Sequence, residues 1–146
     1  MYIFCKAAVL TVVLAGASLA MHPFAYGAWL WPPSPLCPVP GDAQFPLLAL
    51  VAAVEAGAFG LGMAYAVWGY STVSFFRARW QRLVMFVGIV WQLSNWMLHD
   101  NLHINVGPDL SSMIAIEFAF HLTLIASAAL MALALMVQAR DSTAYE

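Results

Sequence analysis

Four apolar stretches alternate with short polar segments along the 146-residue chain, and each is long enough to cross a bilayer as a helix. A membrane-spanning helix needs about 20 apolar residues, and uninterrupted apolar runs favour helices over the alternating strands of a barrel. The predicted spans are residues 2–21, 45–70, 83–102 and 112–137. The pattern therefore predicts an all-α integral membrane bundle of four helices, forming one transmembrane domain over residues 1–146.

The composition agrees with lipid as the main solvent of this chain. Apolar residues make up 64% of it, charged residues only 8%, and the mean hydropathy is +0.84, whereas soluble domains carry about 25% charged residues. The net charge of −2 provides no basic surface for nucleic acid. Because little of the chain lies outside the spans, we expect the bilayer and other membrane protein subunits as its partners, and no nucleic acid.

The basic residues predict the orientation in the cell membrane. All of them fall on one side of the four spans: Lys6, Arg77, Arg79, Arg82 and Arg140. Basic residues flanking spans are enriched in the cytoplasm. Both termini are therefore predicted to be cytoplasmic, and the proline-rich loop 22–44 is predicted to be extracytoplasmic.

The first span has a second interpretation as a secretory signal. It contains Lys6, an apolar stretch and a small-residue cleavage motif ending at Ala20. Cleavage there would leave three spans with unchanged orientation. His22, just beyond this motif, is expected to be solvated.

Two segments are predicted to hold the helices together. The prolines of loop 22–44 restrict φ, which favours a stiff strap over the outer surface. The second span carries small residues at four-residue steps, a spacing that lets two helices approach closely. They are Ala52, Ala56, Gly60 and Ala64. The helix that packs on them is not determined by the pattern.

The acidic and histidine side chains within the spans all fall in the predicted outer halves, and Lys6 lies at the inner end of the first span. Such groups are costly in a membrane and mark functional sites. His99 and His103 are one helical turn apart, as are Glu117 and His121, and Glu55 is the sole acid of the second span. A rise of about 1.5 Å per residue places His121 roughly 9 Å deeper than His99 and close to the depth of Glu55.

This clustering favours a metal site, since imidazole suits copper, zinc and iron, and carboxylates add oxygen ligands. The predicted ligands are His99, His103, His121, Asp100 and Glu117. Glu55, Gln92 and Asn95 are predicted to orient the imidazoles or to relay protons. Histidines that face an oxidising outer compartment favour copper over zinc or iron.

The combination of Asp100 with His99, His103 and His121 resembles the copper-binding membrane subunit of ammonia and methane monooxygenases, which also uses one Asp and two His from adjacent helices. The resemblance covers only the stretch from His99 to His121, and the spacing departs from that family's Asp-x3-His-x12-His. It implies an accessory or cofactor-holding subunit of a membrane oxidoreductase complex rather than an enzyme acting alone. The catalytic residues and the substrate stay undetermined.

Other chemistries remain open. A di-iron centre wants Glu-x-x-His pairs, and this chain has a single Glu-x-x-x-His, at Glu117 and His121. A b-type haem needs facing histidines at matching heights, which the depth estimate for His99 and His121 does not favour. The polar groups could instead handle protons or quinones, or only join helices by hydrogen bonds without any cofactor.

Overall fold

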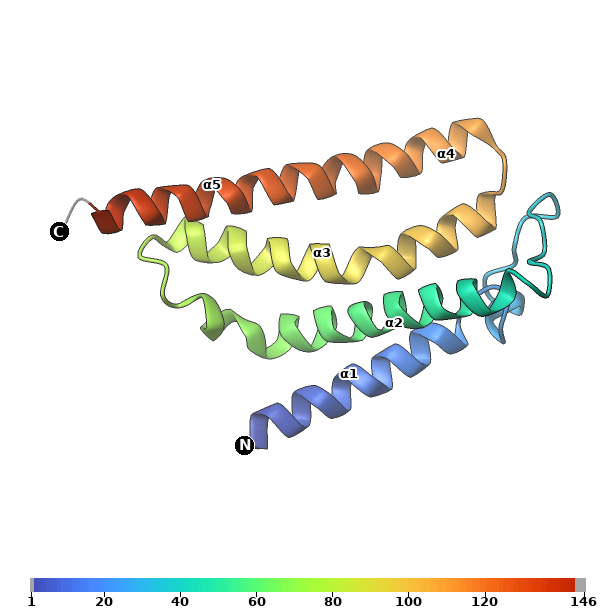
Figure 1. Ribbon diagram of the computed structural model, residues 1–146, viewed down its shortest axis with the longest axis horizontal. Coiled ribbons are helices and arrows are strands. Elements are labelled where there is room, and N and C mark those ends of the chain that lie inside the picture. Colours follow the sequence, from blue (N-terminus) through green and yellow to red (C-terminus); the bar gives the residue numbers. More distant parts are fainter. Residues whose placement is uncertain (1, 144–146) are drawn as a thin grey trace.

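The computed structural model describes residues 2–143, and this part of the chain is helical without strands. Figure 1 shows the long helices lying across the view, with the chain direction reversing from each helix to the next. Their bounds are α1 Tyr2–Ala20, α2 Phe45–Trp68, α3 Arg79–Val106, α4 Leu110–Ile116 and α5 Thr123–Thr143. Short elements complete the order: η1 Gly27–Trp29, η2 Gly69–Val73 and the π-helical segment η3 Glu117–Leu122, which joins α4 to α5 as one rod. The all-α prediction is confirmed.

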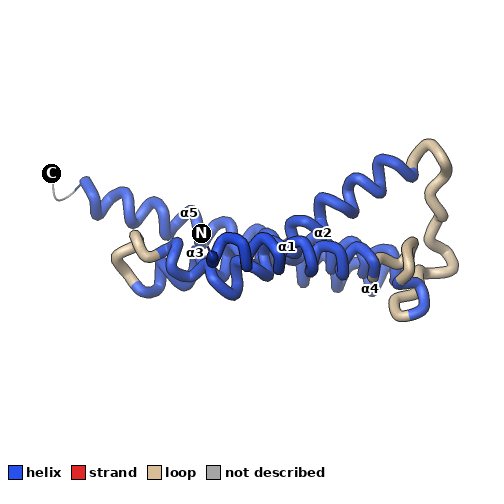
Figure 2. Tube along the Cα trace, turned by 90° about the horizontal axis from the view of Figure 1, so that it is seen from below, coloured by secondary structure: helices blue, strands red, loops and turns tan. Residues whose placement is uncertain are grey.

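The long helices lie side by side in the order α1, α2, α3, α5, and they form a row rather than a closed cluster (Figures 1 and 2). Figure 2 shows this row as one thin layer, from which the ends of α2 and α5 splay. Lipid supplies no hydrophobic force that would close such a row into a bundle. Both broad faces of α3 and α5 are therefore open to the surroundings.

Three helical stretches are long and apolar enough to cross a membrane: Tyr2–Ala20, Phe45–Val73 and Leu110–Asp141. The remaining helix, α3, is 28 residues long but more polar, because its second half carries the histidines and amides. It occupies the interior of the row, between α2 and α5. The most polar helix thus has a protein neighbour on either side.

Small residues set the spacing of α1, α2 and α3. A Cβ at Gly60 would lie 2.3 Å from the Thr11 carbonyl oxygen of α1, and a Cβ at Gly62 would lie 3.0 Å from the Leu93 Cβ of α3. The predicted small-residue stripe is buried at Ala52, Ala56 and Ala64. Its close neighbour at Gly60 is α1, a helix of the same chain.

At the other side of α3, a buried amide fastens it to α5. The Gln81 side chain is fully buried; its Nε2 donates to the Ala134 carbonyl at 3.2 Å, and its Oε1 accepts from the Ala78 backbone N–H at 3.1 Å. About two turns further along α3, Gly88 makes room for the Met131 side chain. These contacts fix the register of the α3–α5 pair.

The proline-rich loop is tied to the last turns of α3. The Trp31 indole donates to the Asn101 carbonyl at 2.9 Å, and the Ser34 backbone N–H donates to the Ile104 carbonyl at 3.0 Å. Gly107 ends α3 with φ of +60°, and a Cβ there would lie 2.5 Å from the Ser34 hydroxyl. Glycine suits this position for both reasons. We call this end of the row, with loop 22–44 and the α3–α4 turn, the loop end.

Candidate metal centre

Two histidines of α3 form the first half of the site near the loop end. His99 and His103 are one turn apart on a continuous helix, so their side chains leave it on the same face. Their Nε2 atoms are 3.0 Å apart, and their rings stand almost perpendicular, at 89°. Both side chains are partly buried. The two imidazoles therefore lie next to each other on one face of α3, as their four-residue spacing predicts.

A tight turn then brings the next helix back along α3. Asp109 caps α4: its carboxylate accepts the Ser112 backbone N–H at 2.9 Å and the Ser111 hydroxyl at 3.0 Å. Hydrogen bonds from Ser112 and Ser111 favour the ionised form and hold the pKa of Asp109 below its usual range. The capped helix continues directly into η3, which begins at Glu117.

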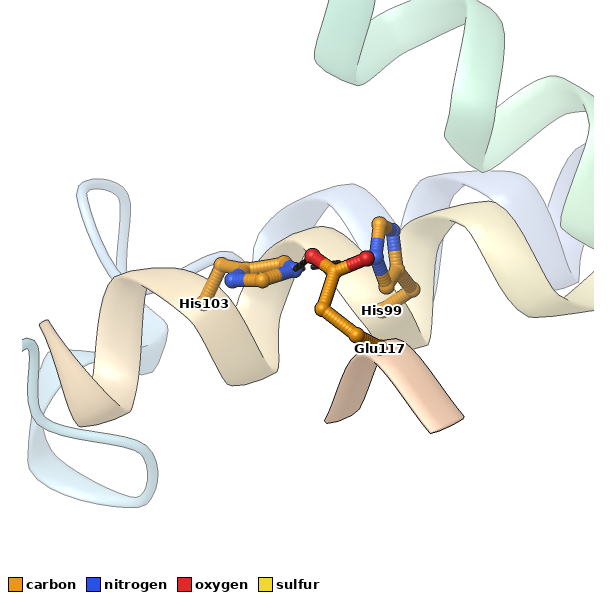
Figure 3. Close-up of side chains that lie close together, drawn as sticks. All are labelled: His99, His103 and Glu117. Atoms are coloured by element: carbon orange, nitrogen blue, oxygen red, sulfur yellow. Dashed lines mark hydrogen bonds and ion pairs between the residues drawn. The ribbon is translucent and has the colours of Figure 1, made fainter. Parts of the chain in front are cut away.

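Glu117 supplies the third donor. Its Oε1 lies 3.5 Å from Nε2 of His103, and one ligand atom each from His99, His103 and Glu117 fall within 4.8 Å of one another. Figure 3 shows the carboxylate of Glu117 between the two imidazoles, which come from the facing helix. We call His99, His103 and Glu117 the triad. It combines two nitrogen donors and one oxygen donor from two helices.

The spacing of the triad can be compared with coordination geometry. Metal–ligand bonds of about 2.0–2.1 Å separate two ligand atoms by about 2.9 Å at a right angle and by about 3.3 Å at the tetrahedral angle. The observed separations are 3.0 Å between the two Nε2 atoms and 3.5 Å from His103 to Glu117. The two separations differ from these values by at most about 0.6 Å. The triad is therefore compatible with tetragonal Cu²⁺ and with tetrahedral Zn²⁺.

His121 adjoins the triad. Its Nδ1 pairs with the second carboxylate oxygen of Glu117, and its ring centroid is 4.5 Å from that of His99. The estimate from helical rise, which placed His121 roughly 9 Å deeper than His99, is therefore wrong. Phe120 also touches the His99 ring, with centroids 5.5 Å apart. The π-helical segment η3 holds Glu117, Phe120 and His121, and such segments occur frequently at functional sites.

Of the two predicted amides, Gln92 bonds across the α3–α5 contact and Asn95 bonds within α3. The Gln92 side chain donates to the Leu124 carbonyl at 2.9 Å and to the Ser127 hydroxyl at 2.7 Å. Asn95 is fully buried and donates to the Trp91 carbonyl of its own helix, while its Oδ1 has no hydrogen-bond partner. Gln92 therefore joins two helices, and Asn95 lies one turn below His99.

Asp100 and Glu55 lie apart from the triad, in the contact between α2 and α3. Asp100 is 3.6 Å from Nε2 of His22, a residue that the sequence left as solvated but whose side chain is only 12% exposed. Asp100 and His22 are also the ionisable groups that act electrostatically on Glu55, whose buried Oε2 has no hydrogen-bond partner. The structure thus divides the predicted ligands, with Asp100 in a second cluster. The only sequence signal for His22 was its position at the same end of the spans.

The triad, with His121 beside it, is the group that can hold a metal ion within residues 2–143. Two of its three members come from α3 and the third from η3. Its interpretation depends on geometry and donor chemistry, because comparisons with protein families, with known proteins and with solved structures gave no match.

Proposed function

We propose that this chain is a membrane subunit that binds one divalent transition metal ion, copper in preference to zinc or iron, through His99, His103 and Glu117. The observation that carries the proposal is the convergence of three ligand atoms within 4.8 Å from two helices. The preference for copper follows from the order of divalent-metal affinities, in which Cu²⁺ stands highest at nitrogen and oxygen sites. The observed separations fit Cu²⁺ and Zn²⁺ alike, so the preference for copper holds where both ions are equally available.

His121 has a supporting role in this proposal. Ligating carboxylates are usually held by a further hydrogen bond. With Nδ1–H donating to one oxygen of Glu117, the other oxygen stays directed toward His103. His121 therefore orients the carboxylate rather than occupying a coordination position, which narrows the sequence-based prediction that it is a ligand.

The wider setting is an oxidoreductase complex in the cell membrane, with the site on the extracytoplasmic side. Arg77 lies just before α3, and Arg79 and Arg82 lie in the first turn of α3, at the opposite end of the row from the triad. Basic flanks favour the cytoplasm, so the triad faces outward. Within residues 2–143 most residues belong to the long helices, which supports an accessory or cofactor-holding role, of the kind found in copper monooxygenases.

Metal analysis of the purified chain tests this function. After exposure to Cu²⁺ and removal of the excess, we expect one copper per chain with a Cu(II) electron paramagnetic resonance signal from nitrogen ligands. His99→Ala and Glu117→Gln should abolish stoichiometric loading, and His121→Asn should weaken affinity by about 10–100-fold, as is typical for residues that support a ligand.

His22→Asn is the matched control, because His22 is a histidine at the same end of the row that pairs with Asp100 instead of the triad. It should keep both the copper and its spectrum. Metal-free wild-type protein would instead assign the polar groups to helix packing without a cofactor. Copper bound equally by wild type and His99→Ala would place the metal elsewhere.

A second function, proton handling, is favoured by one observation at Glu55. A buried carboxylate oxygen without a hydrogen-bond partner favours the protonated acid within a span. The infrared spectrum should then show a carboxylic acid C=O band that is lost in Glu55→Gln while the copper content stays constant. A spectrum unchanged by this substitution would remove the basis for the second function.

A further inference from the structure

The row of helices leaves the triad open on one side. The side chains of Glu117 and His121 are 47% and 41% exposed, and that of His103 is 26% exposed. Glu117 and His121 belong to the apolar stretch Leu110–Asp141, which is long enough to span a membrane. Ionisable groups in such a stretch face other protein or a water-filled cavity rather than lipid. The open side therefore needs a cover that the described part of the chain does not supply.

A groove continues this open side inward between α3 and α5. Its volume is about 320 Å³, and it is lined by Gln92, Trp96, His121, Leu124, Ile125 and Ala128. His121 is shared by the groove and the polar cluster, so the two form one continuous surface. Its character changes along its length, from ionisable at the loop end to mainly apolar further in. A transmembrane helix with one polar residue near its outer end and apolar residues below matches that order.

The charge of the loaded site indicates what the polar residue must be. Two neutral imidazoles and one carboxylate leave a divalent ion with one uncompensated positive charge, which is unfavourable in a low-dielectric membrane. Three protein donors also leave a coordination position open. An anionic side chain from the covering helix would satisfy both needs. A second copy of this chain, packed symmetrically on the same face, would bring Glu117 against Glu117, and like charges would oppose that contact.

We infer that the surface formed by Glu117, His121 and the adjoining groove binds a transmembrane helix of a different protein, which contributes one carboxylate as a further ligand to the metal. This inference rests on the proposed function, because the carboxylate is selected by the bound ion. Without metal, the half-exposed carboxylate of Glu117 would repel the carboxylate of the partner helix.

The test uses a model leucine–alanine transmembrane helix in phosphatidylcholine vesicles, with a single Asp near its outer end and a single Cys further in. The protein carries Cys5→Ser and Cys37→Ser, plus either Ala128→Cys in the groove or Ala126→Cys. Both alanines are exposed, but Ala126 is not a groove residue. A bismaleimide joins neighbouring cysteines, and Zn²⁺ replaces copper because it is redox-inert.

We expect Zn²⁺ to raise cross-linking of the Asp helix at Ala128→Cys about tenfold above that at Ala126→Cys, a ratio equal to ~1.4 kcal/mol. Helices with Asn or Lys in place of Asp should show no such increase, nor should protein with His99→Ala. Equal yields at the two positions, or equal yields for Asp and Lys helices, would overturn the inference. Cross-links between two copies of the protein at Ala128→Cys would assign the face to self-association instead.

The zinc content of the same vesicles separates the two proposals. Protein that holds stoichiometric zinc but does not discriminate among helices refutes the partner and leaves the metal site intact. Protein that holds no zinc removes the metal site, and with it the reason for an anionic partner.

Discussion

Replacing Gly60 with alanine tests how closely α1 packs on α2. A Cβ at this position would lie 2.3 Å from the Thr11 carbonyl oxygen, 2.9 Å from the Ala15 nitrogen and 3.2 Å from the Ala15 Cβ. The two closest atoms belong to the α1 backbone, so no side-chain rotation relieves the clash. A normal carbon–oxygen contact needs about 3.3 Å, and α1 must therefore retreat by about 1 Å.

The magnitude follows from two opposing contributions. Overpacking of a close contact usually costs about 1–3 kcal/mol. Alanine within a helix gains roughly 0.5–1 kcal/mol over glycine. We therefore expect Gly60→Ala to lower the free energy of unfolding by about 1 kcal/mol.

Gly57→Ala is the matched control on the same helix, because a Cβ there meets no atom within 4 Å. It keeps the helix-propensity gain without the clash and should be as stable as wild type or slightly more so. Unfolding by sodium dodecyl sulfate in mixed micelles, followed by tryptophan fluorescence, measures both variants. If Gly60→Ala matched Gly57→Ala, the close α1–α2 contact would be refuted.

Two other substitutions test the contacts that position the triad. Gln81→Leu removes both hydrogen bonds of a fully buried amide and should destabilise the fold by about 1–3 kcal/mol in the same assay; unchanged stability would show that the amide does not fasten α3 to α5. Asp109 has a lowered pKa because of its hydrogen bonds to Ser112 and Ser111. Its contribution to the stability of the fold is therefore complete above the pKa of the unfolded state, about 3.9, and is lost as the pH falls through the lower pKa of the folded state. Stability should therefore fall below about pH 4 in wild type and less steeply in Asp109→Asn, which keeps a capping side chain; identical pH profiles would contradict the cap.

The helices were largely predictable because lipid demands long apolar stretches, and the chain provides three that are long and apolar enough to span a membrane. Their arrangement in a row was not predictable. In water, helices close around a core to hide apolar faces, but lipid accepts such faces. The neighbours of each helix are determined by specific contacts, such as that of Gly60 with α1 or of Gln81 with α5. The sequence pattern identifies such residues but does not show which helix each one contacts.

The parts of the site that lie on a single helix were predictable from the spacing of their residues. His99 and His103 share a face because they are four residues apart, and the same holds for Glu117 and His121. Asp100 could have been separated from them on the same ground, since adjacent residues of a helix point about 100° apart. His99 turns toward η3 and Asp100 toward His22. Consecutive residues of α3 thus belong to two clusters, and α3 is the element that links them.

The position of the α3–α4 turn determines which residues of α3 face which residues of the helix that follows. α3 continues to Val106 and α4 begins at Leu110, so the turn is shorter than the predicted loop 103–111. In a tight antiparallel pair, residues equally distant from the turn face each other. Gln92 precedes Pro108 by as many residues as Leu124 follows it, and these two are hydrogen-bonded.

The same symmetry pairs His99 with Glu117, because each is equally far from Pro108 along the chain. It places His121 level with Asn95, one turn from His99, from where its ring reaches the His99 ring. The predicted depths of His99 and His121 were counted from the assumed outer ends of two different spans, so the errors in both ends added up. Counting both residues from the turn that the two helices share avoids these errors. A glycine-proline turn with an Asp cap, Gly107-Pro108-Asp109, is readable in the sequence. The convergence of Glu117 with the two histidines is therefore a consequence of that turn, and lengthening it by one residue should separate the triad and abolish stoichiometric copper binding while the helices themselves persist.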